Sequence, residues 1–158
     1  MKPLLIASIL ALTAAAAQAG TAQVTFVDPT DYSDGGRHVG EGDQFRTELA
    51  RHLQRLAERV LPADQTIVIE VLDVDLAGEP RISGRLDNPR VVRGRADWPR
   101  IELRYTLRVG DKTLASGQEL VQDMAYMNTS LVLTSTESLP YEKRMLTRWF
   151  ERHFAAAH

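Results

Sequence analysis

The sequence contains no cysteine, which excludes disulfide bonds, thiolate metal sites and cysteine nucleophiles. Aromatic residues are few, at 6% of the chain, whereas 44% of the residues are hydrophobic. The stability of the protein must therefore come from an ordinary hydrophobic core in one domain. The 19 lysines and arginines nearly balance the 21 aspartates and glutamates, and this balance argues against nucleic acid as the main partner.

The linear motifs of the common catalytic sites are also missing. The sequence has no Gly-x-Ser-x-Gly elbow, no His-Glu-x-x-His or Ser-x-x-Lys pair, no phosphate-cradling glycine loop and no Ca²⁺-loop spacing. An enzyme with paired carboxylates needs no such motif, so it is not excluded. The sequence therefore favours a non-enzymatic protein without a cofactor, although a divalent cation stays open as an alternative.

A long apolar run is present at the N-terminus. Lys2 precedes an alanine-rich stretch over residues 4–17, which is short for a membrane span, and Ala17-Gln18-Ala19 matches a signal-peptidase site. We expect residues 1–19 to be a secretory signal peptide that is cleaved after Ala19, so that residues 20–158 form a single periplasmic domain. Cleavage would leave 139 residues with a net charge of −3 and no transmembrane segment. The alternative is an uncleaved membrane anchor.

Alternation of apolar and polar residues predicts a β-hairpin at the centre of the fold. Residues 101–109 alternate with period two, Gly110-Asp111 supplies a tight turn, and residues 113–121 return as the second strand. Residues 24–27 and 66–74 are predicted to be further strands. The second of them is apolar on both faces near its start, which is typical of an interior strand.

Two amphipathic helices complete the prediction. Hydrophobic residues recur at spacings of three and four over residues 45–60, with Asp43 as the expected N-cap. Residues 141–154 show a second such stripe, with Ser138 as N-cap and Pro140 in the first turn. The sequence thus predicts an α+β fold with a single mainly antiparallel or mixed sheet and both helices packed on one face. A β-sandwich is the weaker alternative, because it would leave both helices without a partner.

Residues 81–100 are rich in arginine within a chain that is otherwise acidic. Six arginines against two aspartates give this segment a net charge of +4, and arginine pairs well with carboxylates and phosphates. We interpret the segment as a contact surface for an anionic envelope component or a protein partner. The predicted binding residues are Arg81, Arg85, Arg90, Arg93, Arg95, Trp98 and Arg100. The alternative is that these arginines pair with aspartates of the same chain while Trp98 fills the core.

Three carboxylates near the end of a predicted strand give a second hypothesis. Asp73 and Asp75 are two residues apart, so their side chains should point the same way, and Glu79 lies across the following turn. Such oxygen ligands could hold a divalent cation in a metal-dependent or carboxylate-based hydrolase. The simpler interpretation is that acidic residues end strands and accept hydrogen bonds in turns. A third alternative is a purely structural partner subunit.

Four stretches have fairly specific sequences: VTFVDPTDY at residues 24–32, DVDLAGE at 73–79, GRADWPRI with LRY at 94–105, and DMAY at 123–126. In these stretches the chain resembles an uncharacterised bacterial family, domain of unknown function 3016 (DUF3016). The resemblance extends over essentially all of the expected mature chain. It implies a small secreted protein of Gram-negative bacteria, and it brings no established activity and no site residues.

Overall fold

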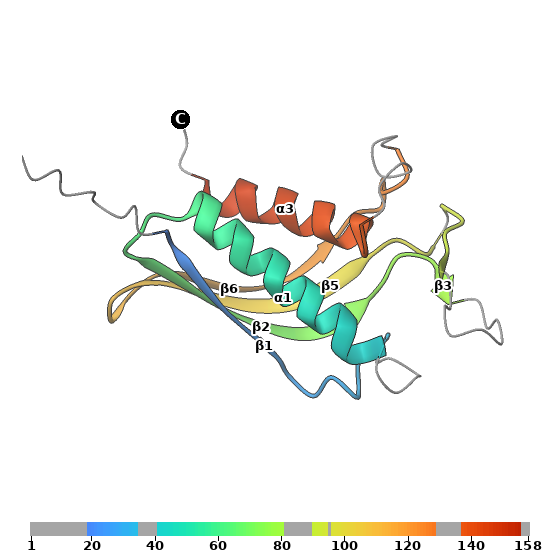
Figure 1. Cartoon of the computed structure of the whole chain (residues 1–158), viewed down its shortest axis with the longest axis horizontal. Helices are drawn as coiled ribbons and strands as arrows, with labels where there is room; N and C mark the ends of the chain where they lie inside the picture. The colour runs from blue at the N-terminus through green and yellow to red at the C-terminus, as the bar shows by residue number, and fades with distance from the viewer. Residues whose placement is uncertain (1–18, 35–40, 81–89, 95, 129–136, 156–158) are drawn as a thin grey trace, which may run out of the picture.

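In the computed structural model, two helices cover one face of a four-stranded sheet (Figure 1). The structure describes residues 19–34, 41–80, 90–94, 96–128 and 137–155, without the side chains of residues 41, 42 and 80. The sheet contains β1 (Thr21–Phe26), β2 (Gln65–Asp75), β5 (Arg100–Val109) and β6 (Lys112–Gln122), and the helices are α1 (Glu41–Val60) and α3 (Pro140–Phe154). A small antiparallel pair, β3 (Glu79–Pro80) and β4 (Arg90–Val91), lies apart from the sheet.

The strand order is β1-β2-β5-β6. β1 runs parallel to β2, and α1 is the crossover that this connection requires. The other two pairings, β2 with β5 and β5 with β6, are antiparallel. The predicted α+β class and the mixed, mainly antiparallel sheet are therefore confirmed, and β2 is an interior strand as expected.

The predicted hairpin is the β5–β6 pair. Gly110 in its two-residue turn has a φ of 54°, in the left-handed region that glycine adopts without steric cost. Alternate residues of β5 are buried beneath the helices, namely Ile101, Leu103, Tyr105 and Leu107. The residues between them face the other side of the sheet, which we call the open face.

The core lies between the sheet and both helices. Leu49, Leu53 and Leu56 of α1 are almost fully buried, and so are Trp149 and Phe150 of α3. Each such side chain contributes about 1.5–3 kcal/mol when it leaves water, so these two stripes hold the helices on the sheet. No helix within the described ranges is long and apolar enough to cross a membrane.

Both predicted helix caps are wrong. α1 begins at Glu41, so Asp43 lies inside the first turn. The N-cap of α3 is Leu139, which has a left-handed φ of 53° and makes no capping side-chain bond. Leu139 packs against the core, whereas Ser138 contacts the Lys143 ammonium at 3.4 Å. Burial of Leu139 thus sets this helix start, and the prediction of Pro140 in the first turn is confirmed.

A β-bulge shifts the end of β2. The register with β5 changes between Val71 and Asp73, so that Leu72 is an extra residue. Before the bulge Val71 faces the core, and after it Val74 does, with 0% of its surface exposed. Without the bulge, period-two alternation would direct Asp73 and Asp75 into the core. The irregularity therefore keeps two carboxylates on the open face.

Candidate functional site

Polar residues gather where β2 leaves the sheet and β5 enters it, at the right of Figure 1. Here the turn 76–80 and residues 90–94 and 96–100 pack against residues 123–128 and the first turn of α3. We call this region, together with the end of β2, the sheet end. The predicted site residues that the structure describes all lie there: Asp73, Asp75, Glu79, Arg90, Arg93, Trp98 and Arg100. Arg81, Arg85 and Arg95 fall outside the described residues.

Arg90 holds the turn that follows β2. Its Nε donates to the carbonyl oxygen of Ala77 at 2.9 Å, and its Nη2 donates to that of Leu76 at 3.0 Å and to the Asp34 carboxylate at 2.7 Å. Nη2 also bonds the carbonyl oxygen of Gly78. Asp34 accepts a further hydrogen bond from the Leu76 amide at 2.8 Å. Because four acceptors surround one guanidinium, Arg90 is used within the chain and is a poor candidate for an external ligand.

Asp97 and Tyr126 connect the next layer. The Tyr126 hydroxyl donates to Asp97 Oδ1 at 2.9 Å and accepts from the Gly94 amide at 3.1 Å. Asp97 also accepts from the Arg93 amide at 2.6 Å through Oδ2, and its carbonyl oxygen accepts from the Gly78 amide at 2.9 Å. The described part of the arginine-rich segment is therefore tied to both the turn after β2 and the segment after β6.

Glu142 is the most deeply buried acid of the sheet end. Its Oε1 accepts from the Ala77 amide at 2.7 Å, and only 2% of its surface is exposed. Burial raises the pKa of this carboxyl, and the nearby Asp34 adds to the rise, while the Ala77 amide and Arg90 oppose it. By accepting the hydrogen bond from the Ala77 amide, the Glu142 side chain connects the start of α3 to the turn after β2.

Arg100 and Trp98 form a partly exposed pair at the sheet end. Arg100 donates from both Nε, at 3.0 Å, and Nη2 to the Asp75 carboxylate, and its guanidinium carbon lies 5.7 Å from the centre of the Trp98 ring. Trp98 Nε1 donates to Gln122 at 3.3 Å. The guanidinium is thus oriented by one carboxylate and one aromatic face, while 41% of the Arg100 side chain stays accessible.

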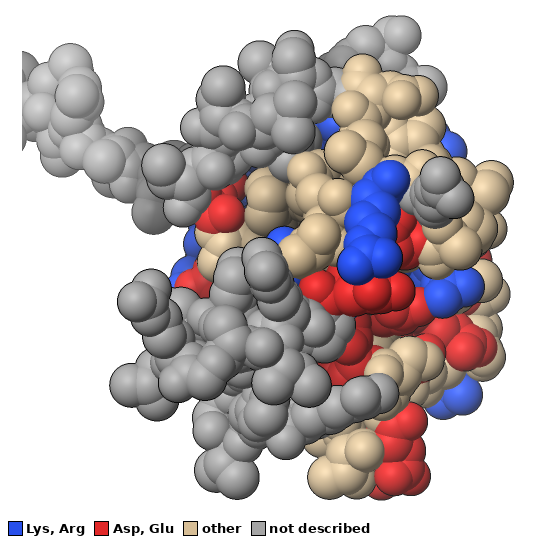
Figure 2. Space-filling view, turned by 90° about the vertical axis from the view of Figure 1, so that its right-hand side faces the viewer, with Lys and Arg blue, Asp and Glu red and all other residues tan. Residues whose placement is uncertain are grey.

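Arg93 is the most exposed described arginine of the segment. Its side chain is 65% accessible and lies 3.8 Å from Glu79, a pair that contributes little in water. Figure 2 shows the side of the molecule that is at the right of Figure 1. On this side basic and acidic side chains lie next to one another, so the exposed charge is mixed rather than uniformly positive. The positive charge of the described arginines Arg90, Arg93 and Arg100 is therefore partly neutralised by neighbouring carboxylates in the fold.

The three carboxylates of the hydrolase hypothesis have separate partners. Asp73 accepts from the Ser33 amide at 2.7 Å and the Ser33 hydroxyl at 2.8 Å, Asp75 is held by Arg100, and Glu79 lies on the small β3–β4 pair. Among the described residues, no group of three histidines, aspartates or glutamates is placed to hold a metal ion. This geometry gives no support to a shared cation or to a paired-carboxylate mechanism.

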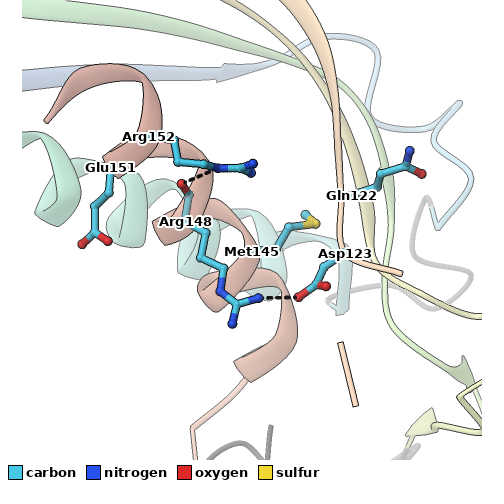
Figure 3. Close-up of a pocket in the computed structure, with 6 residues that line it drawn as sticks. All are labelled: Gln122, Asp123, Met145, Arg148, Glu151 and Arg152. Carbon is cyan, nitrogen blue, oxygen red and sulfur yellow. Dashed lines mark hydrogen bonds and ion pairs between the residues drawn. The ribbon is translucent and has the colours of Figure 1, made fainter. Parts of the chain in front are cut away.

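A hollow of about 590 Å³ lies between the end of β6 and α3 (Figure 3). Its lining residues are Gln122, Asp123, Met145, Arg148, Glu151 and Arg152. Asp123 is bonded by Arg144 at 2.9 Å and lies 3.5 Å from Arg148. Arg144 also donates to the Tyr126 carbonyl oxygen at 2.6 Å, while its Nε and Nη1 are buried without a hydrogen-bond partner among the described residues.

Sequence reasoning missed this hollow and the role of Glu142. A usable signal existed, because Arg144, Arg148 and Arg152 recur at four-residue spacing and so share one side of α3. Nothing in the sequence, however, places that side of the helix next to Asp123.

Comparison with known families agrees with the sequence patterns. A model of the family described as "Protein of unknown function (DUF3016)" matches residues 20–152. The chain belongs to this family. The expected resemblance is thereby confirmed, and the family description assigns no activity.

No curated protein matches the chain. One similar solved structure is the crystal structure of protein XCC0632 from Xanthomonas campestris, which is assigned to the family model DUF330. It is 14% identical, the match covers 88% of this chain and 84% of that one, and the TM-score is 0.33. A likeness of this degree assigns neither a fold nor a function to this DUF3016 member.

Proposed function

We propose that this DUF3016 protein is a non-enzymatic binding module of the bacterial envelope. It would act in the periplasm after export and contact an anionic envelope component through Arg93, Trp98 and Arg100. The N-terminal segment, with its apolar run and Ala17-Gln18-Ala19, supports export. The exposed charge and the partly buried tryptophan of the sheet end support the contact surface.

The main support for this proposal is the position of the Arg100 guanidinium between Asp75 and the Trp98 ring. Asp75 and the Trp98 ring orient its guanidinium in advance, so that little side-chain entropy is lost when an anion binds. Arginine and tryptophan are also the residue types that contribute most at binding surfaces. Arg93 adds a second accessible guanidinium that is only weakly held by Glu79.

The hollow beside Trp98 extends this surface. Gln122 lines it and accepts the hydrogen bond from Trp98, so the ring and the hollow are neighbours. Arg148 contributes a further half-exposed cation at its rim, shared with Asp123. A ligand that contacts Trp98 and extends past Gln122 would therefore enter a hollow that Arg148 and Met145 also line.

The test uses purified protein with lipopolysaccharide, with vesicles that contain phosphatidylglycerol, and with envelope extract. We expect binding to the anionic probes that weakens as salt is raised. The double variant Arg93→Glu with Trp98→Ala should bind at least about tenfold more weakly. Arg108→Glu is the matched control, because Arg108 is an exposed arginine at the opposite end of β5.

Each variant should keep the thermal unfolding midpoint of the parent, so that lost binding reflects the surface alone. Equal weakening by Arg108→Glu would indicate general charge attraction and remove the proposed site. Salt-insensitive capture of a single protein from the extract would replace the anionic component with a protein partner.

A further inference from the structure

β6 is an open edge of the sheet. It pairs with β5 on one side, and no described strand pairs with its other side over its eleven residues. Exposed edges are commonly protected by proline or by charged side chains. β6 has no proline, and its two charged residues are Lys112 at its start and Glu119, which accepts from Trp149 at 3.0 Å and lies 3.2 Å from His153.

Exposed apolar side chains concentrate on this edge. The large hydrophobic residues exposed in the described part of the chain are Val27, Leu114, Leu120 and Met124. Leu114, at 45%, and Leu120, at 55%, both belong to β6. Leu120 lies opposite Glu102 on the open face. The register shift opposite Leu107 and Arg108 makes Leu114 an extra residue of β6. Because its neighbour Ala115 packs against the core, Leu114 also faces the open side.

The two leucines lie symmetrically about Gly117. Leu114 lies three positions before Gly117 in the sequence, and Leu120 lies three positions after it. We propose that β6 pairs antiparallel with β6 of a second copy, with the two-fold axis at Gly117. In this register Leu114 faces the partner's Leu120, and each exposed leucine is covered by the other.

The remaining pairs of this register are compatible. Ser116 would face the partner's Gln118, and Glu119 would face the partner's Ala115, so no two like charges oppose each other. Gly117 lets the two backbones approach at the axis, and the Tyr105 ring already fills the space of its missing Cβ on the core side, at 3.1 Å. The dimer would contain one continuous sheet with all helices on the same face.

Sedimentation over a range of concentrations tests the dimer. We expect the parent protein to dimerise reversibly, and Leu120→Lys to raise the dissociation constant at least about tenfold by placing a charge against the partner's leucine. Val27→Lys is the matched control, since Val27 is an exposed apolar residue after β1, the opposite edge strand, and it should leave the dimer intact. A parent that stays monomeric, or a dimer insensitive to Leu120→Lys, would overturn the proposal.

Charge pairing tests the register. Leu114→Glu alone should also weaken the dimer, whereas Leu114→Glu combined with Leu120→Lys would place opposite charges across the axis and recover much of the lost affinity. The two positions are six residues apart on one strand, too far to pair within one copy. A double variant that is no better than the single variants would refute the Gly117 axis.

Distances between spin labels test the geometry of the dimer without a variant that weakens dimerisation. The absence of native cysteine allows single labels at Ser116→Cys and Gln23→Cys, two exposed positions in the same cross-strand row. Labels at Ser116 should be close across the axis, whereas labels at Gln23 should be separated by seven strand spacings, about 34 Å. A short distance at Gln23 with a long one at Ser116 would place the contact at β1 and exclude the β6 dimer.

Discussion

Between the helices and the sheet, nearly all buried contacts are apolar, whereas at the sheet end the buried contacts are hydrogen bonds to charged groups. Trp149 packs edge-on against Tyr105 with ring centres 5.8 Å apart, and such packing is weakly directional. Arg90 instead satisfies Asp34 and three carbonyl groups, each in a defined direction. The core thus supplies most of the stabilisation, and the sheet end determines the path of irregular segments that no regular hydrogen-bond ladder holds.

The largest expected effect lies in the core. Trp149→Ala should lower the free energy of unfolding by about 3–5 kcal/mol, because it empties the centre of the aromatic cluster between α3 and β5. Chemical denaturation monitored by circular dichroism measures the change. Trp149→Phe, which keeps most of the ring contacts, should cost clearly less. Equal costs for the two variants would mean that the Trp149–Glu119 hydrogen bond, rather than burial, holds this region.

A smaller loss is expected at the sheet end. Arg90→Ala should lower the free energy of unfolding by about 2–3 kcal/mol, because Asp34 and three carbonyl groups lose their donor in a partly buried setting. Arg90→Lys should recover only part of the loss, since one ammonium cannot match the planar guanidinium.

Arg104→Ala is the control for Arg90, because it removes an exposed pair with Glu70 on the open face and should cost less than about 1 kcal/mol. Equal losses for Arg90→Ala and Arg104→Ala would show that the sheet end contributes no more than surface charges do. The apolar core and the polar sheet end would then differ in composition alone.

The smallest effect tests a polar group between the helices. His52 Nε2 lies 2.9 Å from the Lys143 carbonyl oxygen and 3.0 Å from the Thr147 hydroxyl, and burial lowers its pKa to about 4, with Arg55, Lys143 and Arg59 adding to the lowering. The unfolded chain, with a histidine pKa near 6.5, binds more protons than the native state between these values. Stability should therefore fall as pH decreases from about 6.5 toward 4.

For a partly exposed group we expect this loss to be about 1–2 kcal/mol. Urea unfolding at several pH values between 7 and 4 measures it, and His52→Gln should flatten the dependence in that window. An unchanged slope in His52→Gln would assign the acid sensitivity to other groups, such as the carboxylates of the sheet end.

The hairpin and both helix stripes were predictable, because their signals are local and periodic. Residues 101–109 alternate strictly, and the stripe over residues 45–60 occupies one side of a helix, so burial follows from spacing alone. The caps were not predictable in the same way. Leu139 begins α3 because it packs on the core, and that preference is invisible from the neighbouring Ser138 and Pro140.

The candidate site was predictable only as a region. The patterns led to the arginine-rich segment and to Asp73, Asp75 and Glu79. Of that segment, the described residues Arg90, Arg93, Trp98 and Arg100 lie at the same end of the sheet as the three carboxylates. The partners of these residues were out of reach, since Arg90 and Asp34 are 56 positions apart and meet only when β2 and the loop after β1 are in place. The bulge at Leu72, which determines the face of both aspartates, likewise has no signal in the local alternation.

Local physics in the sequence alone determined the two helices, the hairpin and the α+β class, because hydrophobic periodicity must match the period of the element that buries it. Only the tertiary structure decided which arginines bond to carbonyl groups and carboxylates of the same chain and which stay accessible. The reason is that a guanidinium bonds whatever acceptor the fold brings within reach, and long-range packing, not spacing along the chain, sets those neighbours.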